Sequence, residues 1–335
     1  MRAVIVGLGG WGSSWAQVIR DSPDWDIAAL VDVNPQALQN AVAKLEAEPK
    51  SCFPTLRDAV ETISADAVFI FTPPMCGRLA DVSTALDAGL HVLAEKPLTD
   101  SLEDARLMLE RHQGGSLKLM VAQNYRFFAA SAHMRNAVQS GSLITDHCSL
   151  FTGLGPLGYA NVLYHMTWDA PGHHATLMEN GFILSVCVHH LDTMRFVFGE
   201  PESIRAQTWN PPWSWSKSDA CVSAMLTFPG GIRASYFAGW AAHWNETDWY
   251  GHWDLEFENG ALWTDGATTY TIKGDEKVEI PSPATDTQNT RLDVLNEFTS
   301  AIREDRTPAC SIEDNIKTLE MAFAIIESAK TAALR

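Results

Sequence analysis

The sequence is poor in basic residues and contains no cluster of them. It has 24 lysines and arginines against 41 aspartates and glutamates, which gives a formal net charge of −17 at pH 7. A nucleic-acid partner requires clustered positive side chains, because these neutralise the phosphates of the backbone. The charge balance therefore argues against a nucleic-acid partner and is typical of the surface of a soluble cytoplasmic protein.

Cysteines are also few, and their spacing argues against a fold that is stabilised by disulfide bonds or by a zinc site. The six cysteines lie at positions 52, 76, 148, 187, 221 and 310, without a C-x-x-C pair. This pattern favours reduced thiols over a disulfide framework or a zinc site, and we expect no metal. No apolar run reaches the length of a membrane span. The first predicted strand begins within three residues of Met1, which leaves no room for a signal peptide. We expect a cytoplasmic protein without a membrane partner.

Short apolar segments alternate with helical patterns over residues 1–122. The segments that read as buried strands are 3–6, 27–31, 67–71, 91–94 and 119–122. Amphipathic spacing between them predicts helices such as 13–20, 35–47 and 78–88. Such alternation produces right-handed βαβ units and a parallel sheet. The fold class is therefore α/β, with an N-terminal Rossmann domain that contains a doubly wound parallel sheet.

The pattern changes after about residue 145. Longer strands are predicted at 145–153, 202–210, 219–228, 231–239, 252–258, 261–265 and 268–273. Turn residues at Pro229–Gly231 and Asn259–Gly260 predict hairpins. We therefore expect a C-terminal α/β domain over residues 123–310 with a large, open, mostly antiparallel sheet. Helical patterns follow at 287–304 and 312–333, and the segment 311–335 is expected to pack back on the Rossmann domain.

A glycine motif follows the first predicted strand at once. Residues 7–12, Gly-Leu-Gly-Gly-Trp-Gly, satisfy G-x-G-x-x-G between a strand and a helix. Gly7 permits a tight turn, Gly9 lets the backbone approach a pyrophosphate, and Gly12 allows close helix packing. Asp32 ends the second strand 20 residues later. A carboxylate there accepts hydrogen bonds from ribose hydroxyls and repels a 2′-phosphate, which favours NAD over NADP.

The strand at residues 91–94 ends abruptly on Glu95, Lys96 and Pro97. A cation at the carboxyl end of such a strand faces the crevice in which doubly wound sheets bind ligands. Pro97 fixes the direction in which the chain leaves the sheet. Thr72 and Pro73 leave a neighbouring strand at the same edge. The residues expected to contact the cofactor are Gly7, Gly9, Gly10, Trp11, Gly12, Asp32, Thr72, Pro73, Glu95 and Lys96.

A histidine-bearing helix is predicted over residues 181–198. At helical spacing, Ser185, His189 and Asp192 lie on one face, and apolar residues cover much of the rest. An imidazole with a pKa near 6.5 is suited to proton transfer at neutral pH. The alternative is a core histidine that only completes the packing, and the dinucleotide motif with Lys96 favours catalysis. His190 is a further candidate whose side chain should point away from His189.

These motifs together resemble the Gfo/Idh/MocA family, the glucose–fructose oxidoreductase and inositol dehydrogenase group. The resemblance rests on the glycine motif, Glu95-Lys96-Pro97, Asn124-Tyr125-Arg126, and Trp168 ahead of the histidine helix. It implies NAD(P)-dependent oxidation or reduction of a sugar, polyol or related alcohol. Lys96 matches the family's active-site lysine, and His189 matches its general acid or base. The resemblance adds Asn124 to the cofactor contacts and implies substrate contacts from Lys96, Arg126, Trp168, Ser185 and His189.

Two departures from the family pattern concern the expected site. Ser185 stands where members usually carry an aspartate, so it supplies a hydrogen bond without a charge. We therefore place Ser185 beside Lys96 and His189 among the catalytic residues of an altered pocket. Trp15 stands where many members have histidine. An NAD-dependent glycoside hydrolase, which oxidises a sugar transiently and eliminates the aglycone, is one alternative. A non-catalytic NAD-binding regulator is another.

Tryptophan is concentrated in the second half of the chain, where nine of the twelve fall between residues 168 and 263. Indole rings stack on sugar rings, so they favour a carbohydrate pocket. They also cover sheet faces and subunit interfaces. An open sheet with an aromatic face needs covering, and we expect a homodimer or homotetramer. His165, His173 and His174 are expected in the loop before the histidine helix, where one of them contacts substrate.

Overall fold

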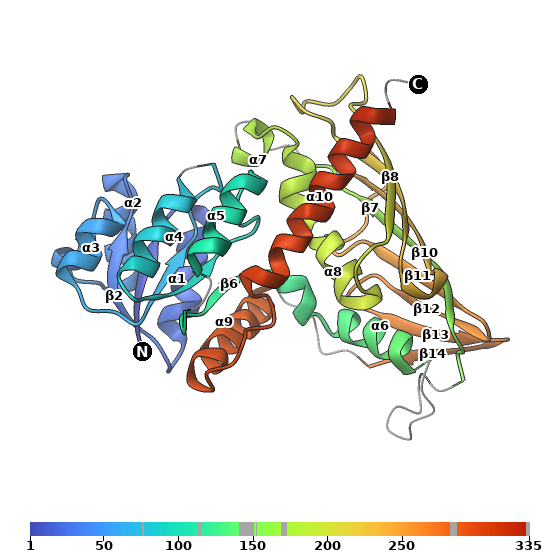
Figure 1. The fold of residues 1–335 in the computed structure, drawn as a ribbon, viewed down its shortest axis with the longest axis horizontal. Coiled ribbons are helices and arrows are strands. Elements are labelled where there is room, and N and C mark those ends of the chain that lie inside the picture. Colours follow the sequence, from blue (N-terminus) through green and yellow to red (C-terminus); the bar gives the residue numbers. More distant parts are fainter. Residues whose placement is uncertain are drawn as a thin grey trace. The chain divides into compact units, whose positions relative to one another are not determined.

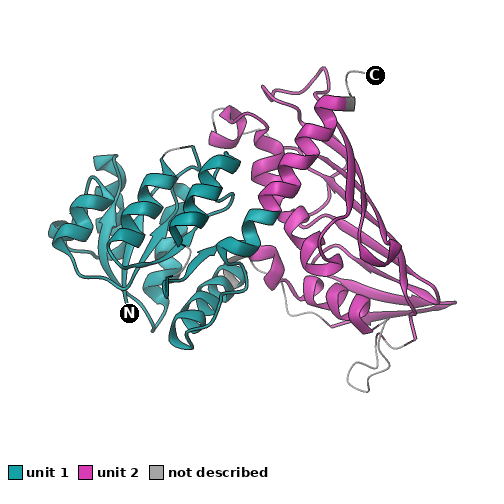
Figure 2. Ribbon diagram, in the orientation of Figure 1, with its two compact units in different colours: residues 1–123, 287–317 teal, residues 124–286, 318–335 magenta. Residues whose placement is uncertain are grey.

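A computed structural model of the chain describes residues 1–75, 77–112, 115–140, 151, 153–168, 173–281 and 287–332 (Figure 1). These residues divide into two units (Figure 2). Unit 1 consists of Met1–Gln123 and Thr287–Lys317. Unit 2 consists of Asn124–Asp286 and Thr318–Arg335.

Unit 1 contains a six-stranded parallel sheet in the order β3-β2-β1-β4-β5-β6. Its strands are β1 Arg2–Val6, β2 Asp26–Val31, β3 Cys52–Phe53, β4 Ala67–Ile70, β5 His91–Ala94 and β6 Leu119–Val121. The helices between them are α1 Gly10–Asp21, α2 Pro35–Leu45, α3 Leu56–Thr62, α4 Arg78–Asp87 and α5 Leu102–His112. This order is that of a doubly wound dinucleotide fold, so the predicted Rossmann sheet is confirmed.

The centre of this sheet is apolar on both faces. All four residues of β4 and the last four of β1 are buried, as expected for parallel strands with helices on each side. The strand order reverses between β1 and β4, whose register pairs Val6 with Ile70. Ligands of such folds bind outside the carboxyl ends of the strands at this switch point. The glycine motif after β1 therefore lies at the binding edge.

Helix α9, Thr287–Arg303, belongs to unit 1 although it follows the strands of unit 2 in the chain. Trp25 explains how it is held. Its ring stacks on Phe298 with centroids 6.1 Å apart, and its indole N–H donates to Thr299 Oγ1 at 2.8 Å. The predicted helices near the end of the chain are thus present, as α9 and α10, Ile312–Ala332.

Unit 2 contains an eight-stranded sheet in the order β14-β13-β12-β11-β7-β10-β9-β8. Every neighbouring pair is antiparallel except β7 with β10, so the prediction of a mostly antiparallel sheet is confirmed. The strands are β7 Leu157–His165, β8 Ser203–Trp209, β9 Cys221–Thr227, β10 Arg233–Gly239, β11 His252–Phe257, β12 Gly260–Thr264, β13 Thr269–Lys273 and β14 Glu276–Ile280. Helices α6, Ala129–Ser140, and α8, Val188–Phe198, lie on one face of the sheet (Figure 1).

Two strands of this sheet were not expected from the sequence. The strand predicted at 145–153 falls almost wholly outside the described residues, and β7 begins at Leu157. Gly158 and Asn161 interrupt the apolar pattern of β7, so the sequence did not predict this strand, which pairs with β10 and β11. Polar β14 pairs only with β13, at the sheet edge. The expectation that His165 lies in a loop was therefore wrong, because His165 ends β7.

The histidine helix also departs from its prediction. Residues Ile183–Cys187 form a π-helical segment, and regular α8 begins at Val188. The wider π turn breaks the α-helical spacing of four residues between Ser185 and His189. The prediction that Ser185 shares one helix face with His189 therefore cannot rest on α-helical spacing.

None of the helices in the described part of the chain combines the length and the hydropathy that a membrane span requires.

Candidate functional site

The glycine motif forms the turn from β1 into α1, and each glycine has a distinct reason to be there. Gly7 has a φ of +87°, and a Cβ on it would lie 2.7 Å from the Thr72 nitrogen. A Cβ on Gly12 would lie 1.9 Å from the Gly7 carbonyl oxygen. A Cβ on Gly9 or Gly10 would meet no heavy atom within 4 Å. The turn is thus tightly packed on its inner side and open where a pyrophosphate would approach the helix N-terminus.

Asp32 is fastened to this turn. Its Oδ2 accepts a hydrogen bond from the Leu8 backbone N–H at 2.7 Å, and its Oδ1 accepts one from Asn34 at 2.8 Å. A carboxylate oxygen accepts more than one hydrogen bond, so both oxygens retain capacity for a hydroxyl donor. The geometry therefore fits an adenosine ribose beside the glycine turn, and the residues present fit a dinucleotide.

Glu95 links the glycine helix to the lysine at the end of β5. Its Oε1 accepts hydrogen bonds from the indole N–H groups of Trp11, at 2.7 Å, and Trp15, at 2.9 Å. Its Oε2 accepts the backbone N–H of Lys96 at 2.9 Å. Glu95 is 6% exposed, so this carboxylate is a buried anchor between α1 and Lys96. The Trp15 departure thus has a structural counterpart, an indole donor to Glu95.

Lys96 follows β5 and is half-buried, and its peptide bond to Pro97 is cis. Burial lowers the pKa of the Lys96 ammonium, while the charge of Glu95 raises it and that of Arg78 lowers it again. Arg78 was missed by the sequence analysis. It begins α4 and is fully buried. A cation at a helix N-terminus opposes the helix dipole, and this was the available signal that Arg78 has another task.

His189 in unit 2 lies flat against Tyr125. The two rings stack with centroids 4.2 Å apart and planes 16° apart. The Tyr125 hydroxyl donates to the Trp249 carbonyl at 2.9 Å, so the ring beneath the imidazole is itself fixed. Tyr125 belongs to η2, Asn124–Phe127, which also carries the predicted Asn124 and Arg126. The structure therefore brings the histidine helix together with this segment.

His190 has a different environment from His189. It is fully buried, and burial lowers its pKa to about 4, which keeps the ring neutral. Its Nε2 lies 3.1 Å from the Trp249 carbonyl oxygen, which only accepts, so Nε2 carries the proton. Its Nδ1 then accepts from the Tyr236 hydroxyl at 2.9 Å. His190 is accordingly a structural histidine.

Arg126 and Asp192 form a bidentate ion pair. Arg126 Nε donates to Asp192 Oδ2 at 2.6 Å, and its second terminal nitrogen donates to Oδ1 at 2.8 Å. Thr318 also donates to Oδ1, at 2.7 Å. The Asp192 side chain is 0% exposed. The pair fixes α8 to η2, and a substrate contact from Arg126 stays a prediction. Ser185 Oγ lies 3.9 Å from the sulfur of Met178.

Four tryptophans of unit 2 form a group, which comprises Trp168, Trp215, Trp240 and Trp249. The Trp168 ring centroid is 5.1 Å from that of Trp240, 6.4 Å from Trp215 and 6.3 Å from Trp249. Trp240 is fully buried and Trp249 is 43% exposed, so the group has a core side and an open side. The ring centroids of His173 and Trp168 are 4.8 Å apart. His173 Nδ1 also accepts the backbone N–H of Ala175, so His173 is the N-cap of α7, His174–Leu177.

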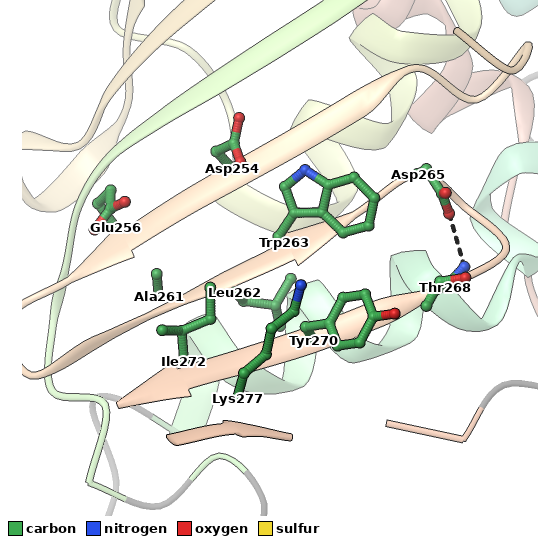
Figure 3. A pocket seen from close by; sticks show the side chains of 10 residues that line it. All are labelled: Asp254, Glu256, Ala261, Leu262, Trp263, Asp265, Thr268, Tyr270, Ile272 and Lys277. Carbon is green, nitrogen blue, oxygen red and sulfur yellow. Dashed lines mark hydrogen bonds between the residues drawn. The ribbon is translucent and has the colours of Figure 1, made fainter. Parts of the chain in front are cut away.

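The predicted residues therefore gather in two sets. Lys96 belongs to unit 1 with the glycine turn, Asp32, Thr72 and Glu95, whereas His189 belongs to unit 2 with Arg126, Ser185 and the tryptophan group. A pocket of about 450 Å³ lies on the sheet of unit 2, where residues from β11 to β14 line it (Figure 3). None of the predicted site residues lines it.

Comparison with known proteins identifies both halves of the chain. Residues 1–123 match the family described as "Oxidoreductase family, NAD-binding Rossmann fold", and residues 153–263 match the "GFO/IDH/MocA C-terminal domain". A 1,5-anhydro-D-fructose reductase from Ensifer adhaerens is 25% identical over 83% of this chain and 81% of its own length. A D-apiose dehydrogenase from Paraburkholderia graminis is 24% identical over 98% of this chain and 88% of its own.

A solved structure resembles the whole fold. It is that of an oxidoreductase from Agrobacterium radiobacter in complex with NAD⁺, L-tartaric acid and magnesium. The match covers 99% of this chain and 97% of that one, with a TM-score of 0.87 and 19% identity. The two family ranges together span more than half of the sequence, and the chain therefore belongs to the GFO/IDH/MocA family of oxidoreductases, with an NAD-binding Rossmann fold in its first 123 residues.

Proposed function

We propose that this protein is an NAD-dependent dehydrogenase that acts on a hydroxyl of a sugar, polyol or glycoside, with Lys96 and His189 as its catalytic pair. The observation that carries the proposal is the open glycine turn with Asp32 hydrogen-bonded to it, in the same unit as a half-buried lysine that follows β5. The relatives named for anhydrofructose and apiose support a carbohydrate-like substrate.

The chain's own groups divide the chemistry between them. The nicotinamide, when bound, takes up or supplies the hydride. Lys96 donates a hydrogen bond to the reacting oxygen and stabilises the negative charge that develops on it. His189 accepts the hydroxyl proton on an imidazole nitrogen, or returns it in the reverse direction. Tyr125 holds the plane of that imidazole.

Substrate binding is assigned to unit 2. Ser185 offers a hydroxyl for a substrate oxygen, and the open side of the tryptophan group offers an apolar surface for a sugar ring. Trp168 lies at the centre of that group. Arg126 is assigned to a substrate contact and is held by its ion pair with Asp192, and Asn124 of η2 is assigned to a cofactor contact.

The function is tested with purified protein, excess NAD, and a panel of sugars, polyols, sugar acids and aryl glycosides. Absorbance of NADH and release of aglycone are followed in the same wells. Growth of NADH with one substrate class supports the dehydrogenase. Aglycone release without NADH contradicts it in favour of the redox-assisted hydrolase. Silence in both channels over the panel, with NAD binding shown separately, would mean a substrate outside the panel or a non-catalytic regulator.

The preference for NAD over NADP is assigned to Asp32. Replacing Asp32 by asparagine removes the charge and one of the two acceptor oxygens. We expect NAD affinity to fall roughly 10- to 100-fold, since a hydrogen bond to a charged group contributes about 1.5–3 kcal/mol. Affinity for NADP should be unchanged or higher, because repulsion of a 2′-phosphate is lost. Calorimetric titration of both cofactors measures this, with Asp58→Asn as the surface control. Equal loss for the two cofactors would contradict the assignment.

Copies of this chain are proposed to associate into a homodimer or homotetramer through the sheet face of unit 2 that lies opposite α6 and α8. Cross-strand pairing places Asp254, Trp263 and Tyr270 in one row across this face, and Lys277 lies 3.8 Å from the Tyr270 ring centroid. These side chains line the pocket of Figure 3. No helix of the described residues covers this face (Figure 1). Its aromatic and charged side chains suit a second copy of the chain.

Light scattering at micromolar concentration tests this assembly. We expect a mass of two or four times 36.8 kDa for the native protein. Trp263→Glu should shift the mass toward one chain, because it places a carboxylate in the interface. Trp244→Glu makes the same change at a residue that is 95% exposed and should leave the mass unchanged. A native protein that scatters as a single chain would refute the assembly.

A further inference from the structure

A single buried arginine connects two loops at the binding edge of unit 1. Arg78 is 1% exposed, and its guanidinium donates to the backbone carbonyls of Thr72, Glu95 and Pro97. It also reaches the Leu98 carbonyl at 3.3 Å. Burial of a charge is unfavourable unless hydrogen bonds compensate it, and here backbone carbonyls supply them.

These carbonyls belong to two specific turns. Thr72 leaves β4, whereas Glu95, Pro97 and Leu98 surround Lys96 at the end of β5. The strands are parallel neighbours, with Ile70 paired to Ala94. A guanidinium presents its N–H groups in one rigid plane, so it contacts both turns only when they keep one spacing. A lysine in its place has a single nitrogen on a flexible stem.

We propose that Arg78 is a positioning residue for Lys96, because it fixes the backbone on both sides of the lysine and ties it to the Thr72 turn. The inference rests on the proposed function, in which Lys96 acts on the reacting oxygen. Residues 72–73 and 95–96 were each expected at the cofactor, so Arg78 would hold both parts of the cofactor edge in register without itself touching a ligand.

The charge of Arg78 gives this role a signature that packing alone lacks. Burial and the positive charge of Arg78 both lower the pKa of Lys96, and the carboxylate of Glu95 opposes them. Removal of the Arg78 charge should therefore raise the pKa of Lys96. An arginine that served only to fill space would leave the titration of Lys96 unaltered when an apolar side chain of similar length replaced it.

The test measures Lys96 directly in the protein without substrate. Competitive acetylation with acetic anhydride over a pH series, read by mass spectrometry, gives the pKa of Lys96. Arg78→Met should raise this pKa, because the positive charge that lowers it is removed. Arg78→Lys keeps the charge and should leave the pKa near its native value. Both variants should increase hydrogen exchange of the amides of Glu95, Lys96 and Leu98 by at least about 10-fold, because the planar fork is lost.

Arg195→Met is the matched control. Arg195 is a second buried arginine, with a side chain 2% exposed, but it lies in unit 2 and pairs with Glu200. Its loss should leave both Lys96 readouts native. Native Lys96 titration and native exchange at 95–98 in Arg78→Met would overturn the proposal. If Arg78→Met fails to fold, Arg78→Lys decides, since native exchange at 95–98 in that variant overturns it equally. Failure of the proposed function would appear elsewhere, as undiminished turnover in Lys96→Met.

Discussion

Replacement of Lys96 by methionine is expected to lower turnover about 10³-fold while NAD affinity stays within a few-fold of native. The side chain is assigned to the reacting oxygen, and a preorganised donor to a developing oxyanion is typically worth 10²–10³ in rate. Cofactor affinity is assigned mainly to the glycine turn and to Asp32, whose carboxylate accepts the backbone N–H groups of Leu8 and Asn34. Chemistry and binding should therefore separate in this variant.

The measurement pairs steady-state rates with a binding titration. Turnover is followed by NADH absorbance on the substrate that the panel identifies. NADH binding is followed by quenching of tryptophan emission, since Trp11 and Trp15 lie on α1 beside the glycine turn. Lys118→Met is the control, because Lys118 is a lysine of unit 1 with a side chain 12% exposed and an ion pair to Asp305. Undiminished turnover in Lys96→Met would remove Lys96 from the mechanism.

The largest effect on stability is expected at Asp192. Replacement by alanine should lower the free energy of unfolding by about 3–5 kcal/mol, the usual result when one partner of a buried ion pair is removed. The Asp192 side chain is inaccessible to solvent, and it accepts two hydrogen bonds from Arg126 and one from Thr318. Its loss leaves the Arg126 guanidinium, 8% exposed, without this counter-charge.

Urea denaturation followed by circular dichroism measures the loss. Glu327→Ala is the control, because Glu327 pairs with Lys330 on α10 with both side chains more than half exposed. Exposed pairs contribute about 0–1 kcal/mol. The double variant Asp192→Leu with Arg126→Met should recover part of the stability, since no unpaired charge remains. A loss at Asp192 no larger than that at Glu327 would show that the pair is not a determinant of stability.

Ser185 is the one member of the proposed catalytic set whose side chain does not ionise near neutral pH. It lies in the π-helical segment, and its hydroxyl is 3.9 Å from the sulfur of Met178. A hydroxyl brings no charge to an imidazole. The His189 ring stacks on the ring of Tyr125, and the Tyr125 hydroxyl donates to the Trp249 carbonyl. Stacking on a fixed aromatic ring therefore helps to hold the plane of the imidazole.

The sequence by itself determined the features that depend on neighbouring residues. Continuous apolar runs identified the central strands of the first sheet, because such strands are buried on both faces. The glycine spacing identified the turn after β1, because only glycine fits the φ of Gly7 and the contact at Gly12. Asp32 and Lys96 could be placed at the binding edge, since they lie one and two residues beyond the end of a strand.

The tertiary structure decided what depends on residues far apart in the chain. The indole of Trp15 meets Glu95 80 positions away, and Thr318 meets Asp192 126 positions away, distances over which no local pattern carries information. Arg78 and Tyr125 were not predicted for the same reason. Arg78 donates to backbone carbonyls of other segments, and Tyr125 stacks on the His189 ring of another helix. Strand β7 was missed because its pairing partners lie on both sides, and pairing outweighed a weak local preference. The candidate reactive residues could therefore be predicted from local sequence, whereas the residues that position them are known only from the long-range contacts of the fold.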